Sequence, residues 1–277
     1  MKRVLLATAC LLVMSSLALA QANTATTHSN AATSKQPRKQ RSVRINAGLQ
    51  CGNDPILPTD GTTIYDFVDV SGQGTGTNYY LVHLKDGHSY SAEVYDSTDS
   101  AISATAQMVL YAPGCGSTLP TTDVANIDPD LSNDFADRIS WIQAGDSDAI
   151  LAVINPDQIN YYVYNVRIVD TTLHNPRWST FNGFITQYAL VNNTEFPITG
   201  NLTVYDNTGV VLISRTGISI PAGGENFQTV STPPNHFGFA TFGFVGPAGA
   251  ITADAYFING NATVVVPSTF APRNYQH

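Results

Sequence analysis

Apolar and polar residues alternate along most of the chain beyond residue 60, and Gly, Pro, Asn or Asp interrupts the alternation roughly every ten residues. A period of two is typical of strands that bury one face. No long stretch has apolar residues at the i, i+3, i+4, i+7 spacing of an amphipathic helix. The pattern therefore predicts an all-β fold of the sandwich type.

In the first half, the segment 79–96 (YYLVHLKDGHSYSAEVYD) predicts a hairpin that turns at Asp86-Gly87. The predicted buried face of this hairpin consists of Tyr80, Val82, Leu84, Tyr90, Ala92 and Val94. Further strands are predicted over 106–111 and 139–142. In the segment 149–170, Ile150, Ala152 and Ile154 share one face before a turn at 155–157, and Tyr162, Tyr164, Val166 and Ile168 share one face after it.

The second half repeats this pattern with different residues. Strands are predicted within FITQYALVNNT, ITGNLTVYDNTGVVLISRTGISIPAGGENFQTV, GFATFGFVGPAGAITADAYFING and TVVVPSTF. Val204 and Val211 flank Asp206-Asn207-Thr208-Gly209, a sequence that predicts a tight hairpin turn.

The N-terminus has the composition of an export signal and a tether. Residues 1–20 combine Lys2 and Arg3 with an apolar stretch and end in Ala-Leu-Ala, which predicts a secretory signal peptide. Residues 21–44 have almost no large apolar side chain and five basic residues without an acid, so we expect a disordered basic linker. The protein is therefore predicted to be exported, and the cell surface, the periplasm and the medium remain open as destinations.

The charge of the remaining chain restricts its partners. From residue 45 onward six Lys and Arg stand against 21 Asp and Glu, which gives a net charge of about −15. Such a surface repels nucleic acid, and no apolar stretch is long enough to predict a transmembrane span.

Two cysteines, Cys51 and Cys115, remain after the predicted signal peptide. In an exported chain such a pair predicts one disulfide. Two free thiols are the alternative.

The first half resembles the bacterial pre-peptidase C-terminal domain, a jelly-roll-like β-sandwich. The resemblance covers roughly residues 62–170 and rests on YYLVHLKDGHSYSAEVYDS, AQMVLYAP, DPDLSNDFADRISWIQAGDSD and YYVYNVRIV. It implies a non-catalytic module of a secreted bacterial protein, although no peptidase domain accompanies it here.

The second half is similar to immunoglobulin-like modules of secreted bacterial proteins over about 183–270, on the segments NLTVYDNTGVVL and ISIPAGG. We therefore expect four parts: the signal peptide 1–20, the linker 21–44, a pre-peptidase C-terminal-like sandwich over 45–170 and an immunoglobulin-like sandwich over 171–277.

The densest acidic cluster lies between residues 123 and 137. Calcium takes about six to eight oxygen ligands, so Asp128, Asp130 and Asp134 are the candidate calcium ligands of this loop. A solvated acidic loop is the alternative, because the spacing matches no EF-hand. No other cofactor is expected.

The segment 173–184 (LHNPRWSTFNGF) follows the last strand of the first module and precedes the first strand predicted for the second. An arginine beside a tryptophan can cover such a junction, with the guanidinium on the ring face. We interpret His174, Arg177 and Trp178 as packing between the modules. A ligand cleft at the junction is the alternative.

No catalytic template is recognisable in the sequence. It lacks a G-x-S-x-G elbow and an HExxH motif, and Glu93, Glu195 and Glu225, the only glutamates, are far apart. Tyr79, Tyr80, Tyr161 and Tyr162 could form a sugar-stacking platform, although strand tyrosines often face a core.

These observations predict a non-enzymatic, secreted or cell-surface binding or structural protein whose extracellular ligand is a carbohydrate or a protein. A secreted hydrolase with an active site dispersed over loops is the alternative. A periplasmic assembly partner with an open edge strand is a third interpretation.

Thermal unfolding tests the disulfide and the calcium site together. A disulfide between Cys51 and Cys115 closes a loop of about 65 residues, so reduction is expected to cost roughly 4 kcal/mol and to lower the Tm. Calcium is expected to raise the Tm relative to EDTA if the acidic loop binds it. An unchanged Tm in reductant would contradict the disulfide, and an unchanged Tm in calcium would leave a solvated loop.

Overall fold

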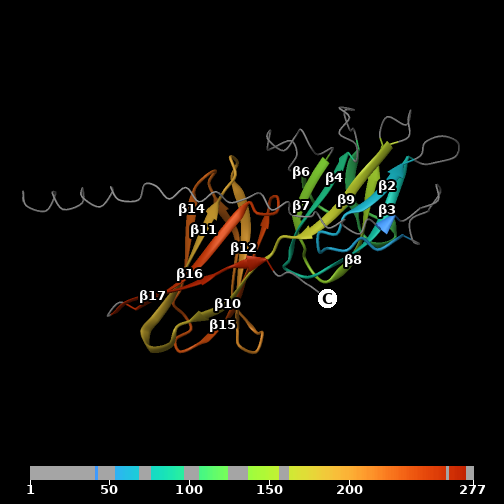
Figure 1. Ribbon diagram of the computed structural model, residues 1–277. Helices are drawn as coiled ribbons and strands as arrows, with labels where there is room; N and C mark the ends of the chain where they lie inside the picture. Colours follow the sequence, from blue (N-terminus) through green and yellow to red (C-terminus); the bar gives the residue numbers. More distant parts are fainter. Residues whose placement is uncertain are drawn as a thin grey trace, which may run out of the picture. The chain divides into compact units, whose positions relative to one another are not determined.

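The structure is a computed structural model that describes residues 41–42, 54–68, 76–96, 106–123, 137–155, 162–259 and 262–272. These residues form β-strands joined by turns and two short 3-10 turns, with no α-helix among them (Figure 1). The predicted all-β fold is confirmed. No helix within these ranges is long and apolar enough to cross a membrane.

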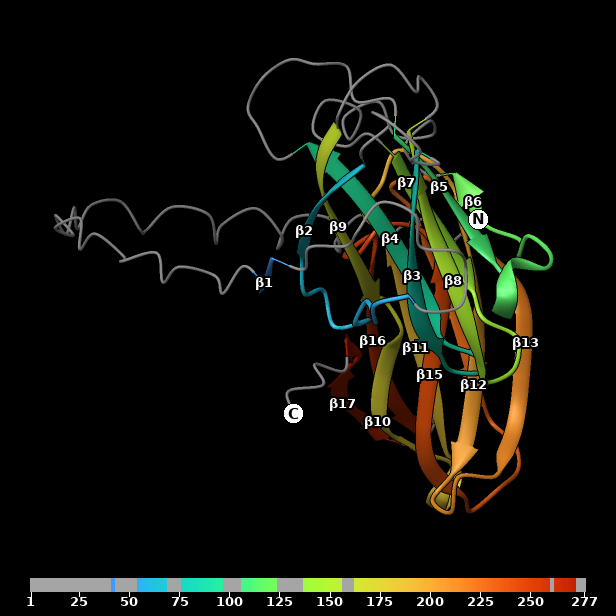
Figure 2. The ribbon, with the colours of Figure 1, turned by 90° about the vertical axis from the view of Figure 1, so that its right-hand side faces the viewer.

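The first sandwich contains the strands from β1 to β9. Its larger sheet has the order β1-β2-β9-β4-β7-β6, and its smaller sheet has the order β3-β8-β5 (Figure 2). The bounds of its strands are β1 Arg41–Ser42, β2 Ile64–Val68, β3 Thr77–Leu84, β4 Ser89–Asp96, β5 Gln107–Tyr111, β6 Thr122–Asp123, β7 Asp137–Ile142, β8 Ser147–Ile154 and β9 Tyr162–Asp170. A hydrophobic cluster contributed by both sheets, with Tyr80, Trp141 and Leu151 among its members, forms the core.

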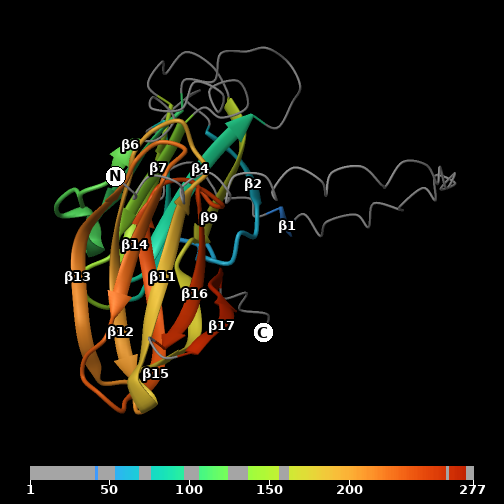
Figure 3. The same cartoon turned by 90° about the vertical axis from the view of Figure 1, so that its left-hand side faces the viewer.

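The second sandwich pairs a five-stranded sheet, β13-β12-β15-β10-β18, with a four-stranded sheet, β14-β11-β16-β17 (Figure 3). The bounds of its strands are β10 Leu173–Ser179, β11 Phe184–Asn192, β12 Ile198–Asp206, β13 Val211–Ile220, β14 Glu225–Val230, β15 Phe237–Val245, β16 Ile251–Asn259, β17 Ala262–Thr269 and β18 Ala271–Pro272. Its own hydrophobic cluster includes Trp178, Tyr188 and Phe242.

The predicted hairpin over 79–96 is wrong in its pairing. Strand β3 pairs with β8 in the smaller sheet, whereas β4 pairs with β7 and β9 in the larger sheet. The turn at Asp86-Gly87 therefore crosses from one sheet to the other. The six predicted inward residues are all buried, because the two strands face one another across the core instead of sharing a face. Alternation identifies a buried face but not the strand that pairs beside it.

Strand β8 is buried on both faces. Ala149, Leu151 and Val153 belong to the core cluster, and Ile150 and Ala152 on the other face are buried as well. All five residues from 149 to 153 are buried. Because both faces of this strand are covered, an alternation of apolar and polar residues is missing there, and the sequence could not assign its register.

The predicted hairpin at Asp206 is confirmed. Strands β12 and β13 are antiparallel on either side of it. One carboxylate oxygen of Asp206 accepts hydrogen bonds from the backbone of Thr208 and Val210, and Gly209 has a φ of 91°. A hydrogen bond from the Thr208 hydroxyl contributes most to lowering the pKa of Asp206, and the backbone bonds lower it further.

Side chains join the edge strands β13 and β14, which belong to opposite sheets. The Arg215 guanidinium donates to the Gln228 side chain and to the Thr229 carbonyl, at 2.8 and 2.7 Å. The Asn226 amide donates to the Ser219 carbonyl at 3.0 Å. Backbone carbonyls of both edges are thus occupied within the sandwich, which is one way in which proteins protect edge strands from pairing with other chains.

Residues Arg41 and Ser42 form β1, which lies parallel to the start of β2. This short strand lies within the segment 21–44 for which composition predicted disorder. The remainder of that segment lies outside the described residues.

Substitution of Gly238 tests the close packing of strands in the second sandwich. A Cβ at this position would lie 2.1 Å from the Tyr205 carbonyl oxygen. The same oxygen accepts the Trp178 indole N–H at 2.6 Å. We expect Gly238→Ala to lower the free energy of unfolding by about 1–3 kcal/mol in denaturant titrations. Gly116→Ala is the control, since nothing lies within 4 Å of a Cβ at Gly116. Equal stability of the two variants would contradict this packing.

Candidate functional site

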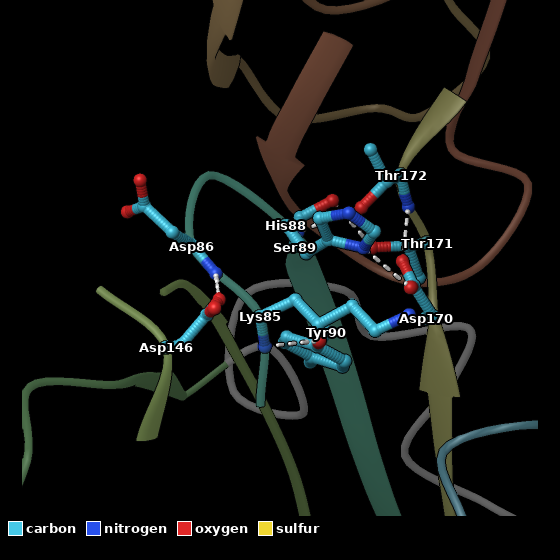
Figure 4. A network of polar contacts seen from close by, with 9 residues as sticks. All are labelled: Lys85, Asp86, His88, Ser89, Tyr90, Asp146, Asp170, Thr171 and Thr172. Atoms are coloured by element: carbon cyan, nitrogen blue, oxygen red, sulfur yellow. Dashed lines mark hydrogen bonds and ion pairs between the residues drawn. The ribbon is translucent and has the colours of Figure 1, made fainter. Parts of the chain in front are cut away.

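A network of polar contacts lies where β9 leads into β10 (Figure 4). Thr171 and Thr172 link the two strands and are both buried. The Thr171 amide donates to the Ser89 carbonyl at 2.8 Å, and the Ser89 amide donates to the Thr172 hydroxyl at 2.9 Å (Figure 4). The link is therefore fixed to the start of β4, and we call this region the junction.

A histidine and an aspartate pair at the junction. His88 Nδ1 lies 2.7 Å from an Asp170 carboxylate oxygen, and the other oxygen accepts the Thr172 amide at 3.0 Å. Burial raises the pKa of Asp170, but the hydrogen bonds from His88 and Thr172 outweigh burial and hold the pKa below its usual value. Asp170 therefore keeps its negative charge beside the imidazole at neutral pH.

The His88–Asp170 pair has the chemistry of a general base and its orienting acid, and Ser89 is its immediate neighbour. Ser89 is fully buried, and its hydroxyl oxygen accepts a hydrogen bond from the Thr171 hydroxyl at 2.9 Å. A buried hydroxyl bonded in this way is closed to a substrate carbonyl. We therefore assign these residues to fixing the junction.

Contacts between residues of the two sandwiches continue beyond the junction. The Ser140 hydroxyl on β7 donates to the Gly246 carbonyl at 3.1 Å and accepts the Gly246 amide at 2.9 Å. A Cβ at Gly243 on β15 would lie 3.0 Å from the Gly87 carbonyl oxygen. Only glycine fits so close an approach without displacement.

The three predicted interface residues occupy different surroundings. The His174 ring lies edge-on to the His88 ring, with 5.6 Å between the centroids. Trp178 is buried in the core of the second sandwich. Arg177 is exposed, and its guanidinium carbon lies 6.0 Å from the centroid of the Phe257 ring, not over the tryptophan. The described contacts of Arg177 and Trp178 thus lie within the second sandwich, and His174 contacts the first.

The turn beside the junction is held by two carboxylates. The Asp86 amide donates to Asp146 at 2.8 Å, and Asp86 accepts the Gly145 amide at 2.6 Å. Of the two histidines that flank this turn, His83 is exposed and lies 2.6 Å from Asp148, whereas His88 is largely shielded from solvent.

The candidate calcium ligands Asp128, Asp130 and Asp134 lie outside the described residues, so the calcium site stays a prediction. No group of three or more metal-binding side chains occurs within the described ranges. Cys51 is also outside these ranges, and Cys115 is the last residue of the 3-10 turn Pro113–Cys115. The disulfide between them therefore stays a prediction.

Asp137, at the start of β7, has a carboxyl group with a raised pKa that was not predicted from the sequence. Burial raises the pKa of Asp137 to about 6. The Met108 amide opposes this shift by donating to the carboxylate at 2.6 Å, and the negative charge of Asp123 adds to it. The sequence contains one indication that this carboxyl is buried, namely an aspartate followed directly by a buried strand. Met108, whose amide bonds the carboxylate, is almost thirty residues away in the chain.

Glu93, one of the three glutamates considered for hydrolysis, is occupied by two arginines. Arg138 lies 3.0 Å from one of its oxygens, and Arg167 donates to the other. Glu93 is only 2% exposed, so a substrate cannot reach it. Glu195 and Glu225 are both exposed on the surface of the second sandwich.

The suggested tyrosine platform is wrong for Tyr80. Its side chain is buried in the core, where the hydroxyl donates to Asp66 at 2.7 Å and lies 2.6 Å from the Tyr164 hydroxyl. Tyr79 is half-buried, and the side chains of Tyr161 and Tyr162 lie outside the description.

Exposed aromatic residues occur instead on the second sandwich. Phe181 is 41% exposed and Phe237 is 48% exposed, with 5.7 Å between their ring centroids. The Tyr205 and Phe239 rings are stacked, with 4.6 Å between their centroids, and Val211 on β13 is paired opposite Tyr205. We call these five residues the apolar strip.

A scan against models of protein families finds no match, and a search of curated proteins finds no similar sequence.

Asp137→Asn tests the raised pKa. The native state holds this proton more tightly than the unfolded chain does, so stability falls as pH rises from about 4 to about 6. We expect the variant to gain about 1–3 kcal/mol above pH 6 and almost nothing near pH 4, by thermal unfolding. Asp254→Asn controls for the loss of one negative charge. A gain that is equal at both pH values would contradict the raised pKa.

Proposed function

We propose that this chain is an exported, non-catalytic protein that binds a protein ligand through the apolar strip. The observation that carries the proposal is this set of neighbouring apolar side chains, of which Phe181, Phe237 and Val211 are exposed and Tyr205 and Phe239 are half-buried. Soluble proteins rarely expose such sets unless another molecule covers them.

Strand alternation explains how the strip arises. On β15, Ala240, Phe242 and Phe244 point into the core, so Phe237 and Phe239 point outward. Tyr205 is the partner of Phe239 on β12, and Val211 is the partner of Tyr205 on β13. The strip thus crosses three adjacent strands and continues to Phe181 through its contact with Phe237.

The ring geometry favours a protein over a sugar. Tyr205 and Phe239 are inclined by only 12°, so each ring covers one face of the other. The Phe181 and Phe237 rings are tilted by 47° and present no common plane for a flat sugar ring. Aromatic side chains that project at different angles suit the pockets of a protein partner, where such residues dominate the binding energy.

Charge narrows the class of partner further. The chain carries about −15 from residue 45 onward, so an acidic partner would meet repulsion. A neutral or basic protein surface fits this charge.

The remaining expectations belong to the same proposal. A signal peptide, a Cys51–Cys115 disulfide and an extracellular or periplasmic location suit a binding protein with this composition. We also keep the pre-peptidase C-terminal-like and immunoglobulin-like assignments of the two sandwiches, as well as calcium binding by Asp128, Asp130 and Asp134, within the proposal. Two sandwiches with separate cores support the modular arrangement.

Asp137 is the observation that favours the alternative of a hydrolase, because a carboxyl with a pKa near 6 can act as a general acid. One of its oxygens accepts the Met108 amide, which ties it to β5. We therefore interpret Asp137 as a structural group of the first sandwich.

The apolar strip is tested by placing the photo-crosslinking residue benzoylphenylalanine at Phe237 in cells that export the full chain. We expect covalent adducts with one protein, identified by mass spectrometry, and their loss when Phe181→Ser is added. The matched control places the same residue at Phe227, which is 50% exposed on β14 of the opposite sheet. Equal adducts at both positions, or none at Phe237, would contradict the proposal, and a glycan adduct would contradict the class of ligand.

A further inference from the structure

We propose that Asn182 is a site of spontaneous deamidation, which converts its side-chain amide into a carboxylate at one end of the apolar strip. Asn182 lies in the 3-10 turn Phe181–Gly183, between β10 and β11. The modification itself is independent of the proposed function. Its effect on ligand binding rests on the proposed function, because Phe181 belongs to the strip.

Asn182 is followed by a glycine, which leaves the reaction unhindered. Deamidation begins when the backbone nitrogen of the next residue attacks the asparagine side chain, and glycine has no Cβ beside that nitrogen. A Cβ built at Gly183 would lie in open space, so neighbouring parts of the chain do not crowd this position either. The sequence contains two asparagine-glycine pairs, Asn182-Gly183 and Asn259-Gly260.

The surroundings of Asn182 leave its side chain accessible. Asn182 is exposed, and within the described residues its side-chain amide makes no hydrogen bond. Its backbone φ is 53°, in the left-handed region that asparagine tolerates better than most residues, and the φ of Gly183 is 76°. No described bond therefore holds the side-chain amide away from the backbone.

The second asparagine of this kind is held by a bond to the first. Asn259 is paired with Phe184 at the end of β16, and its side-chain amide donates to the Asn182 carbonyl oxygen at 3.1 Å. This bond restrains the Asn259 amide. It also draws electron density out of the peptide group between Asn182 and Gly183, which stabilises the negative charge that the Gly183 nitrogen acquires when it loses its proton.

The reaction uses only the chain and water. The Gly183 nitrogen loses its proton to solvent and attacks Cγ of Asn182, which closes a succinimide ring. The bond from Cγ to Nδ2 breaks, and that nitrogen takes up a proton and leaves as ammonia. Water then opens the ring at Cγ to give aspartate, or at the backbone carbonyl carbon to give isoaspartate. The attack is intramolecular, so no entropy is lost in bringing the reacting groups together.

The product changes the end of the apolar strip. A carboxylate appears directly beside Phe181, whose ring lies 5.7 Å from the Phe237 ring. A charge that an apolar partner covers loses its hydration, which costs free energy. Isoaspartate also lengthens the backbone by one carbon and so displaces Phe181. Both changes weaken binding to an apolar surface, and the strip is therefore expected to lose affinity as the protein ages.

Peptide mapping by mass spectrometry tests the chemistry in the full chain after incubation at physiological temperature. We expect the mass increase of deamidation at Asn182, together with labelling by an isoaspartate methyltransferase. Because the reacting form is the deprotonated Gly183 amide, the rate is expected to rise about tenfold from about pH 7 to about pH 8. Asn207 is the internal control, since it is exposed but followed by Thr208.

A rate at Asn182 no higher than the rate at Asn207 would overturn the proposal, and a faster reaction at Asn259 would overturn the assignment of the site. Asn182→Gly is the matched variant, because glycine accepts the positive φ and carries no amide. In isoelectric focusing, the wild type is expected to gain an acidic form faster than this variant does. Equal rates would contradict deamidation at Asn182.

The effect on the strip is tested by crosslinking from benzoylphenylalanine at Phe237. Asn182→Asp is expected to reduce the adducts several-fold, whereas Asn182→Gly is expected to keep them. Equal adducts in both variants would overturn the effect on binding. An absence of adducts even with Asn182 intact would contradict the proposed function and this effect together, whereas the peptide map measures deamidation without any partner.

Discussion

The short, buried link between β9 and β10 is the constraint on which the arrangement of the molecule depends. Thr171 and Thr172 leave no room for a flexible spacer, and each is bonded to Ser89 at the start of β4. A buried backbone must satisfy its polar groups, so the link can follow only a path that provides such partners. The path also decides which residues of the second sandwich come next to the first. His174, two residues beyond the link, reaches His88 for this reason.

Buried polar groups in the first sandwich specify the register of neighbouring strands, at some cost in stability. Glu93 lies between Arg138 and Arg167 on three adjacent strands, in the registers that pair Glu93 with each arginine. A shift of either neighbour by one residue would leave a buried carboxylate without its cation, which is far more costly than a lost apolar contact. Asp66, Tyr80 and Tyr164 make a second such set within the core, where burial raises the pKa of Asp66. Such groups fix strand register where apolar alternation alone would tolerate slippage.

The sequence predicted the fold class and most buried faces, because alternation directly reports which side of a strand is covered. It predicted the Asp206 turn because a single carboxylate and a glycine determine that turn locally. It did not predict that β3 and β4 belong to different sheets, since a turn at Asp86-Gly87 suits either arrangement. The apolar strip was also missed. Phe237 and Phe239 alternate with Gly238 and Ala240, and the sequence alone does not reveal that the smaller residues face inward. Likewise, the raised pKa of Asp137 results from its burial, which only the fold produces.

The topology of the first sandwich also sets the order in which its parts can form. Strand β2 pairs with β9, and β4 lies between β9 and β7, so the larger sheet stays incomplete until almost the last residue of this half has been made. Connections that cross between sheets provide few local contacts, and folds dominated by distant pairings form slowly. A nascent chain therefore cannot complete this sheet until about 160 residues have been made, and its unpaired strands are exposed to aggregation until then. The same pairings that bind the finished sandwich together thus delay its formation until the first half of the chain is complete.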